Sequence, residues 1–318
     1  MEQFIRSQDF EARWGENLAN HMPMALLSLR GLGFEDDVLQ SFSDFYQRRL
    51  SALPKSQGRI GRENWREHLG EYEFLSDYGV YFSDQIRRYG LHEVFIHHLP
   101  ILVDDMISDG FHPLIRLAFG VDFDLIEEQA MALAYWAAVY QSRPVPSVGQ
   151  HRDVWAVFAN FSELGLEPIR QGLISERLEQ AIVQPEFRKR IHVDVVQACS
   201  LDDVREVALR LHWARNNIVS LHAVTSVHGA RVLIDAVPEL RASIVAHLAY
   251  GIAAMVWAEG APALVDIPEE AESEAWDDLR EGVRDSRNDH AIKLMYSCQE
   301  EWQHYDDPRY QQMASRIR

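Results

Sequence analysis

Four histidines in this sequence lie in local frames whose composition favours metal binding. The frames are Asn20-His21-Met22-Pro23, Gly110-Phe111-His112-Pro113, His222-Ala223-Val224-Thr225 and Asn288-Asp289-His290-Ala291. His21, His112 and His290 lie close to predicted helix starts, where free backbone N–H groups create a positive potential that disfavours a protonated imidazole. Because neutral imidazole is the form that binds a transition metal, we expect a metal site with redox chemistry.

Each of these histidines also has a simpler interpretation. His21 is followed closely by Pro23, which is tolerated in a first helical turn. His112 directly precedes Pro113, which disfavours the α conformation and predicts a residue just outside a helix. Either side chain could act as a local cap, and His222 could be a hydrogen-bonded core histidine. No two histidines are four positions apart in the sequence (i and i+4), so a metal site must collect single ligands from separate segments.

The segment after His222 carries further polar residues with a predicted role in catalysis. Thr225 lies on the same predicted helical face as His222, whereas His228 lies about 120° away around the axis. We expect His228, Thr225 and Arg231 to be catalytic residues that orient hydroxyl or keto groups of a substrate. A buried, hydrogen-bonded His228 and an Arg231 paired with an acidic neighbour are the alternatives.

Lys293 is one of three lysines in the chain and follows His290 by three residues on the same predicted helical face. Its neighbours on both sides are apolar, which indicates a partly buried stretch. A buried lysine tends to lose its charge, and the neutral amine can react with carbon dioxide to give a carbamate with an anionic oxygen. The alternative is a surface lysine whose stem packs on the protein while its ammonium group stays in water.

Other familiar chemistries lack their motifs in this sequence. It contains no Gly-x-Gly-x-x-Gly, no Walker loop and no Gly-x-Ser-x-Gly elbow. A ferritin-like di-iron centre needs two Glu-x-x-His motifs, and Glu301-Trp302-Gln303-His304 supplies one. A di-iron site is therefore incomplete.

Composition narrows the class of protein. The 318 residues are 47% apolar, enough to bury a core, and carry a formal net charge of −18, which argues against nucleic acid as a partner. Two cysteines are too few for a disulfide scaffold. The segment Met1 to Asp9 has no apolar region typical of a signal peptide, and the longest uncharged stretch, Ser243 to Ala258, is too short to span a membrane. We expect a cytoplasmic protein without a membrane partner and interpret that stretch as a buried helix.

Apolar residues recur at spacings of three and four through most of the chain, which predicts an all-α fold. Proline and glycine place helix ends, with a helix that opens at Pro113 and stops near Gly120, and Ser200 is a predicted N-cap. The loop Ser142 to Gly149 could be an interdomain linker. Because the histidines lie on both sides of it, we expect instead one large helical domain, residues 1–318, with a metal site buried between helices.

The four histidine frames, with Asp289-His290-Ala291-Ile292-Lys293-Leu294 as the last, resemble the questin oxidase family between about residue 17 and residue 300. Members include enzymes that open anthraquinone rings oxidatively and are often described as Baeyer–Villiger-type oxidases of secondary metabolism. The resemblance implies a mainly helical oxidoreductase with a mononuclear non-haem iron. The ligands that it implies here are His21, His112, His222, His290 and a carboxylated Lys293.

On this interpretation the chain is a non-haem iron oxygenase in which Fe(II) and dioxygen transform an aromatic or quinone natural product. NADPH is a candidate external reductant, but the sequence shows no recognisable nicotinamide-binding motif and leaves open whether NADPH is required. Two alternatives belong to other classes: a non-catalytic helical protein with a structural metal site, and a helical module that binds a hydrophobic small molecule. Metal identity and oxygen uptake separate the three. The sequence leaves the oligomeric state open.

Overall fold

The expected mainly α fold is confirmed by a computed structural model, which describes residues 2–6, 8–143, 145, 158, 161–192, 196–197, 199–268 and 273–317. The helices before residue 140 are α1 (Glu2–Ile5), α2 (Met22–Gly31), α3 (Asp36–Tyr46), α4 (Leu75–Tyr89), α5 (Leu91–Leu102), α6 (His112–Asp122) and α7 (Ile126–Val139). The later ones are α9 (Ile174–Ile182), α10 (Pro185–Arg190), α12 (Leu201–Arg215), α13 (Ile218–Ala236), α14 (Arg241–Ala258), α15 (Trp276–Glu281), α16 (Asp289–Tyr305) and α17 (Arg309–Ala314).

Shorter elements connect these helices. The 3₁₀ turns are η1 (Gln47–Arg49), η2 (Tyr72–Phe74), η3 (Val103–Asp105), η4 (Ser108–Phe111) and η5 (Pro238–Leu240). In the described part of the chain, the sheet is a single antiparallel pair, β1 (Arg13–Trp14) and β2 (Leu18–Ala19), with Arg13 opposite Ala19.

Side-chain caps fix where the long C-terminal helices begin. Ser200 accepts a hydrogen bond from the backbone N–H of Asp203 (3.1 Å), and the Asp203 carboxylate accepts one from the N–H of Ser200 (2.8 Å), which confirms the predicted N-cap of α12. At α13, the Asn217 side chain accepts from the N–H of Ser220 (2.9 Å) in the same reciprocal arrangement. These caps satisfy backbone donors that would otherwise be unpaired, so each helix starts at a defined residue.

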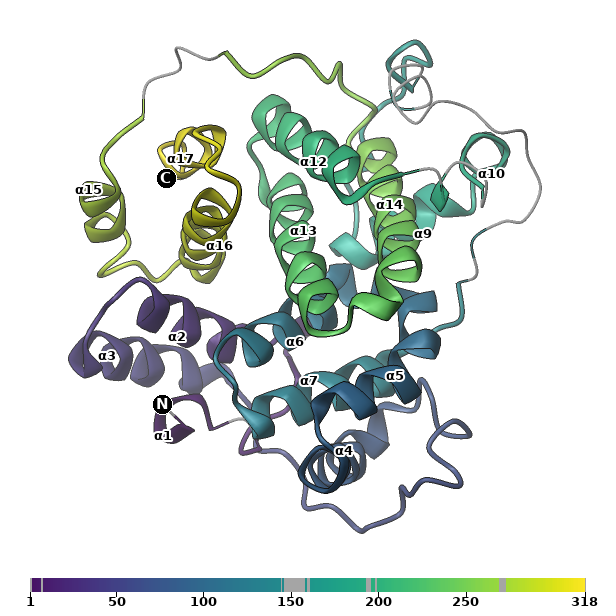
Figure 1. Ribbon diagram of the computed structural model, residues 1–318, viewed down its shortest axis with the longest axis vertical. Helices are drawn as coiled ribbons and strands as arrows, with labels where there is room; N and C mark the ends of the chain where they lie inside the picture. The colour runs from purple at the N-terminus through teal and green to yellow at the C-terminus, as the bar shows by residue number, and fades with distance from the viewer. Residues whose placement is uncertain are drawn as a thin grey trace.

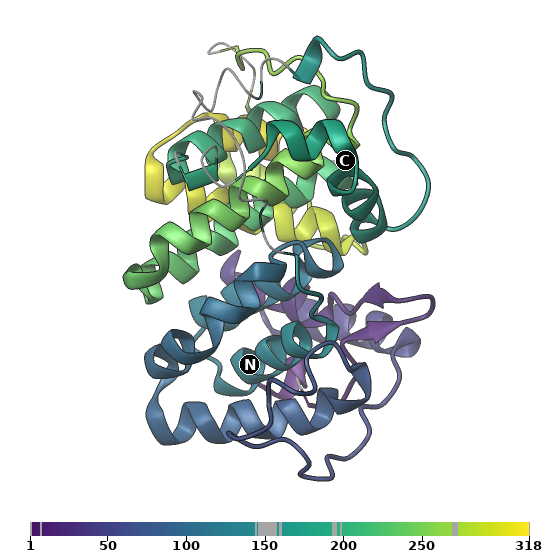
Figure 2. The same ribbon diagram turned by 90° about the vertical axis from the view of Figure 1, so that its right-hand side faces the viewer.

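The helices form two layers that follow the order of the chain. In Figures 1 and 2, α2 to α7 occupy the lower part of the molecule, and α9, α12 to α14, α16 and α17 occupy the upper part. Within the lower layer α4 packs on α7 and α6 packs on α7, while α12 packs on α13 in the upper one. The layers meet where α13 crosses α6 and where α16 lies against α2. Side chains from both layers therefore converge at this junction.

Helix α14 is the buried helix expected from the uncharged stretch Ser243 to Ala258, since most of its residues are buried. It is the one helix of the described residues that is long and apolar enough to cross a membrane by length and composition, and such mostly buried helices are common in protein cores. Gly251 allows it to pack closely, because a Cβ there would lie 2.4 Å from Cζ of Phe111. The apolar faces of α14 thus cover the turn that precedes α6.

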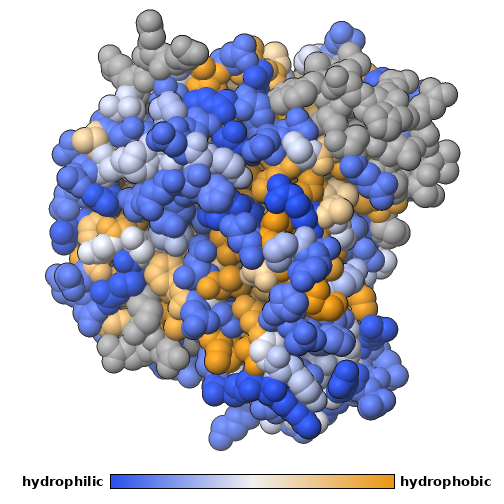
Figure 3. All heavy atoms as spheres, in the orientation of Figure 1, coloured by the Kyte–Doolittle hydropathy of each residue, from blue (hydrophilic) through white to orange (hydrophobic). Residues whose placement is uncertain are grey.

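One continuous cluster of buried apolar side chains runs through both layers. The face of the molecule in Figure 3 is mainly hydrophilic, with apolar side chains visible between the elements. This distribution agrees with a core buried between helices whose outer faces are charged. The loop Ser142 to Gly149 lies largely outside the described residues, and the single domain over residues 1–318 stays a prediction.

Candidate metal centre

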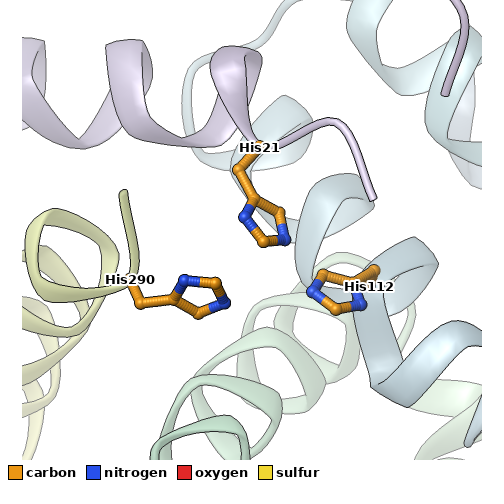
Figure 4. A group of neighbouring side chains, drawn as sticks. All are labelled: His21, His112 and His290. Atoms are coloured by element: carbon orange, nitrogen blue, oxygen red, sulfur yellow. The ribbon is translucent and has the colours of Figure 1, made fainter. Parts of the chain in front are cut away.

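The four histidines of the sequence frames converge at the junction of the two layers. His21 is the N-cap residue of α2, His112 begins α6, His222 lies in the first turns of α13, and His290 is the second residue of α16. The predicted positions at helix starts are thereby confirmed for His21, His112 and His290. Figure 4 shows the rings of these three histidines pointing toward one another from three different helices.

The rings are close enough to share one ion. Candidate ligand nitrogens of His21, His112 and His290 all lie within 4.8 Å of one another. The His222 ring completes the group, with its centroid 4.8 Å from that of His112 and 5.1 Å from that of His290. The Nε2 atoms of His112 and His222 are 3.1 Å apart. The His222 ring thus lies beside this group of three, and four helices contribute imidazoles to one cluster.

The backbone before His112 is unusual. Asp109, Gly110 and Phe111 all have left-handed conformations, with φ of 43°, 69° and 69°. For Phe111, which is buried, this conformation costs on the order of 1–2 kcal/mol, and such strain concentrates at functional sites. His112 itself is α-helical (φ −57°), so the expectation of a residue just outside the helix is wrong. The left-handed turn ends at Phe111 and lets Pro113 follow a helical His112 in the first turn.

The Nδ1 atom of every ring in the cluster is engaged by an oxygen acceptor. One carboxylate oxygen of Asp289 lies 2.6 Å from Nδ1 of His290 and 3.2 Å from Nδ1 of His21. The backbone carbonyl of Asp109 accepts from Nδ1 of His112. The carbonyl of Ile218, one turn earlier in α13, accepts from Nδ1 of His222 (2.6 Å). These contacts require the tautomer with a proton on Nδ1, which leaves Nε2 of each ring with a free lone pair.

Electrostatics keep these rings neutral. Burial lowers the pKa of His21, His112 and His222 well below the ordinary value, and that of His290 is also lowered, with the charge of Lys293 adding to the effect in each case. The rings are therefore ready to bind a cation without first losing a proton.

The donor set fits a transition metal. Nε2 of His21 is buried without a hydrogen-bond partner, and two Nε2 lone pairs, those of His112 and His222, face each other at 3.1 Å. Neither arrangement is favourable for neutral imidazoles unless a cation or a proton lies between them. Imidazole nitrogens suit zinc, copper, iron and nickel, and acceptors on the far side of each ring are typical of metal-binding histidines.

Lys293 belongs to the same cluster. Its side chain is fully buried and Nζ has no hydrogen-bond partner, so the alternative of a surface lysine is wrong. Burial lowers the pKa of Lys293 to about 8, and the nearby carboxylate of Asp289 opposes this shift. An amine with that pKa is partly neutral at physiological pH and is available as a nucleophile or a ligand.

Two cavities adjoin the cluster. One, of about 210 Å³, reaches His21, His112 and His290 and has apolar walls that include Leu173 and Ile174. The other, of about 270 Å³, also reaches His290 and has Leu221 and Leu294 in its wall. Ile218 lines both. A small organic molecule in the first cavity would lie beside the histidine nitrogens.

The predicted catalytic residues of α13 lie elsewhere. Thr225 donates its hydroxyl proton to the carbonyl of Leu221 (3.3 Å). His228 is fully buried, with Nδ1 2.8 Å from a carboxylate oxygen of Glu301 and Nε2 3.3 Å from Asp122. Arg231 donates to the same Glu301 oxygen (2.6 Å) and does not line either cavity. His228 and Arg231 thus share the Glu301 carboxylate about two turns along α13 from His222, whereas Thr225 bonds to the backbone about one turn from it. The catalytic role of all three residues stays a prediction.

Asp289 and Asp109 are the site residues that sequence reasoning left without a role. Asp289 directly precedes His290 at a helix start, and this adjacency was a usable signal. Its contact with His21, which is far away in the sequence, depends on tertiary packing and had no sequence signal. The Asp109 carbonyl lies three residues before His112 and reaches its ring through the left-handed turn, which the sequence did not predict. Asn288 caps α16 by accepting a hydrogen bond from the backbone N–H of His290 (3.1 Å), which fixes the residue at which that helix begins.

Similarity to known proteins is limited to part of the chain. No curated protein matches the chain. Residues 18–162 match the family model described as questin oxidase-like, a segment that includes His21 and His112 and ends before His222, His290 and Lys293. This match bears out the resemblance for the part of the chain that carries the His21 and His112 frames, where the chain is similar to questin oxidase-like proteins.

Proposed function

We propose that this protein is a non-haem iron oxygenase that acts on an aromatic or quinone small molecule. The observation that carries the proposal is the cluster of four imidazoles, each with Nδ1 beside an oxygen acceptor. Ligand nitrogens of His21, His112 and His290 lie within 4.8 Å of one another, and Nε2 of His222 lies 3.1 Å from Nε2 of His112. Kinship with questin oxidase-like proteins suggests an oxidative enzyme for aromatic substrates. The proposed ligands are His21, His112, His222 and His290, with Lys293 as a carboxylated lysine.

Bound iron(II) would supply the activation of dioxygen. The protein residues would hold and orient the reactants. Asp289 and the carbonyls of Asp109 and Ile218 keep the rings in one tautomer and orientation, which removes the need to reorganise them during reaction. The apolar cavity beside the rings would hold an aromatic substrate and limit the access of water.

Lys293 has a separate role in this proposal. Its neutral Nζ attacks carbon dioxide, a C–N bond forms, and one proton is released, so the side chain becomes a carbamate anion. That anion would balance part of the metal charge, which four neutral imidazoles cannot do. The lack of a hydrogen-bond partner for Nζ supports this role, since a buried amine without a partner is unfavourable in the unmodified protein. NADPH as an external reductant stays a prediction.

A structural zinc site is the second candidate function, because structural zinc binds four protein ligands and imidazole nitrogen is one of the ligand types that it takes. The two cavities that reach His290 favour the catalytic proposal, since a catalytic metal site needs space for a substrate and a structural site does not.

Metal analysis of protein purified anaerobically without chelators tests the proposal. We expect near-stoichiometric iron by inductively coupled plasma mass spectrometry, and oxygen uptake when phenols and quinones are added. An exposed variant, His304→Ala, serves as the matched control and should keep its metal. Stoichiometric zinc would support the structural site, and no metal after reconstitution with iron(II) would favour the hydrophobic binding module.

A further inference from the structure

The cavity of about 210 Å³ beside the histidines has one apolar wall and one cationic residue. Leu18, Leu173, Ile174 and Ile218 contribute the apolar surface. Ile218 links this wall to the metal cluster, because its carbonyl accepts from Nδ1 of His222 while its side chain, which is 49% exposed, lines the cavity. A planar ring that packs on Ile218 would therefore lie close to the cluster.

Among the residues that the structure describes, Arg177 is the only arginine or lysine that lines this cavity. Its Nε donates to the carbonyl of Gly172 (3.0 Å), which anchors the base of the guanidinium group. Among the described residues, the structure gives its two Nη groups no hydrogen-bond or acidic partner. The chain has 49 acidic residues against 31 basic ones, and many of its other arginines are paired with carboxylates, so a half-buried guanidinium without one is notable.

The one carboxylate in the wall of this cavity does not compete for Arg177. Asp109 accepts hydrogen bonds from Nε of Arg13 (2.6 Å) and from the hydroxyl of Tyr135. Its charge is therefore already compensated within the protein. An anionic ligand in the cavity would meet the free Nη pair of Arg177 and little repulsion from Asp109.

We propose that Arg177 binds the carboxylate of the substrate, so that the substrate is an aromatic carboxylate whose ring lies between Arg177 and the histidines. The planar Nη pair matches a carboxylate in a bidentate manner, which fixes orientation as well as affinity. The inference rests on the proposed function only in naming this ligand as the substrate, since binding itself requires no turnover.

Two probes of similar shape test the charge preference: 2-naphthoate and its neutral analogue 2-acetylnaphthalene. Their dissociation constants are measured by isothermal titration calorimetry with the full chain, both as purified and after chelator treatment. We expect the native protein to bind 2-naphthoate at least about tenfold more tightly, as a charge-assisted hydrogen-bonded pair supplies. Arg177→Gln should remove this preference without weakening the neutral probe, and Arg177→Lys should retain part of it.

Arg170→Gln is the matched control, because Arg170 is an exposed arginine of the same segment that does not line the cavity. The inference is overturned if 2-naphthoate fails to bind the native protein, if Arg177→Gln keeps the preference, or if Arg170→Gln loses it equally. Loss of the preference only after chelator treatment would assign the carboxylate to the metal and also overturn it. Absence of iron or oxygen uptake with an intact preference would contradict the proposed function alone.

Discussion

Asp289 lies 2.6 Å from Nδ1 of His290, and the same carboxylate oxygen reaches His21 on the opposite layer of the fold. One acidic side chain therefore orients two of the candidate ligands. Burial opposes ionisation of Asp289, but the adjoining rings of His21 and His290 lower its pKa, so the carboxylate stays charged. It also supplies negative charge close to the neutral rings of His21 and His290.

Replacing this carboxylate should weaken metal binding. In Asp289→Ala the rings of His21 and His290 lose the acceptor that fixes their tautomer, and we expect an affinity loss of about 10- to 100-fold. Competition with a chromogenic chelator measures it. Asp285→Ala, four residues earlier in an exposed position, is the control. Equal affinities in the two variants would contradict the role assigned to Asp289.

Removing a ligand should abolish metal binding while the fold persists. We expect His112→Ala and His290→Ala to retain less than a tenth of the native metal content, because each removes one of four donors and leaves a gap that water fills. The helical circular dichroism should be unchanged, since both rings contact the cluster more than the apolar core. Full metal retention in both variants would refute the site assignment.

Lys293 gives a prediction that separates the amine from its carbamate. Lys293→Ala should lower metal occupancy, and a small carboxylate such as acetate or propionate should partly restore it by replacing the anionic oxygen. The native protein equilibrated with ¹³C-labelled carbon dioxide should show a carbamate carbon resonance that the variant lacks. The resonance should strengthen as the pH rises through about 8, since the neutral amine is the reacting form. Unchanged occupancy in the variant would exclude a carbamate ligand.

The sequence predicted the helical fold and the helix starts at His21, His112 and His290, and it singled out the four histidines and Lys293, whose roles as ligands stay predictions. These features depend on local signals: apolar spacing, proline and asparagine near helix starts, and histidine in distinctive frames. The contact of Asp289 with His21 and the position of Arg177 beside the histidines depend on segments that are far apart in the sequence. The left-handed backbone of Phe111 had no sequence signal, because a bulky residue rarely adopts it. The prediction that Pro113 places His112 outside the helix was wrong, because the left-handed turn before His112 determines its conformation.

His228 also shows the limit of helical periodicity. The spacing along α13 gave its direction around the axis, but its partners come from α6 and α16, where Asp122 and Glu301 lie. Those partners turn a residue predicted to face substrate into a buried cation between two carboxylates. Burial alone would lower the pKa of His228, but Asp122 and Glu301 raise it to about 9.

This raised pKa predicts how stability changes with pH. The folded protein holds the His228 proton more tightly than the unfolded chain, whose histidine has a pKa near 6.5, so the contribution is fully present below pH 6.5 and is lost as the pH rises to about 9. The shift corresponds to on the order of 3 kcal/mol of unfolding free energy across that interval. Lys293, with its lowered pKa, has the opposite slope above pH 8, so the native protein alone would show a partly cancelled effect.

The difference between the native protein and His228→Gln isolates the His228 contribution. We expect the variant to be less stable at pH 6.5, because a neutral glutamine cannot form an ion pair with either carboxylate. The difference in unfolding free energy between the two proteins should narrow steadily toward pH 9. Urea unfolding of chelator-treated protein, followed by circular dichroism across this pH range, measures the gap without a contribution from bound metal. His304→Gln, an exposed substitution, should show the same pH dependence as the native protein. A gap that stays constant with pH would mean that His228 is neutral, and its contacts with Asp122 and Glu301 would then act as ordinary hydrogen bonds.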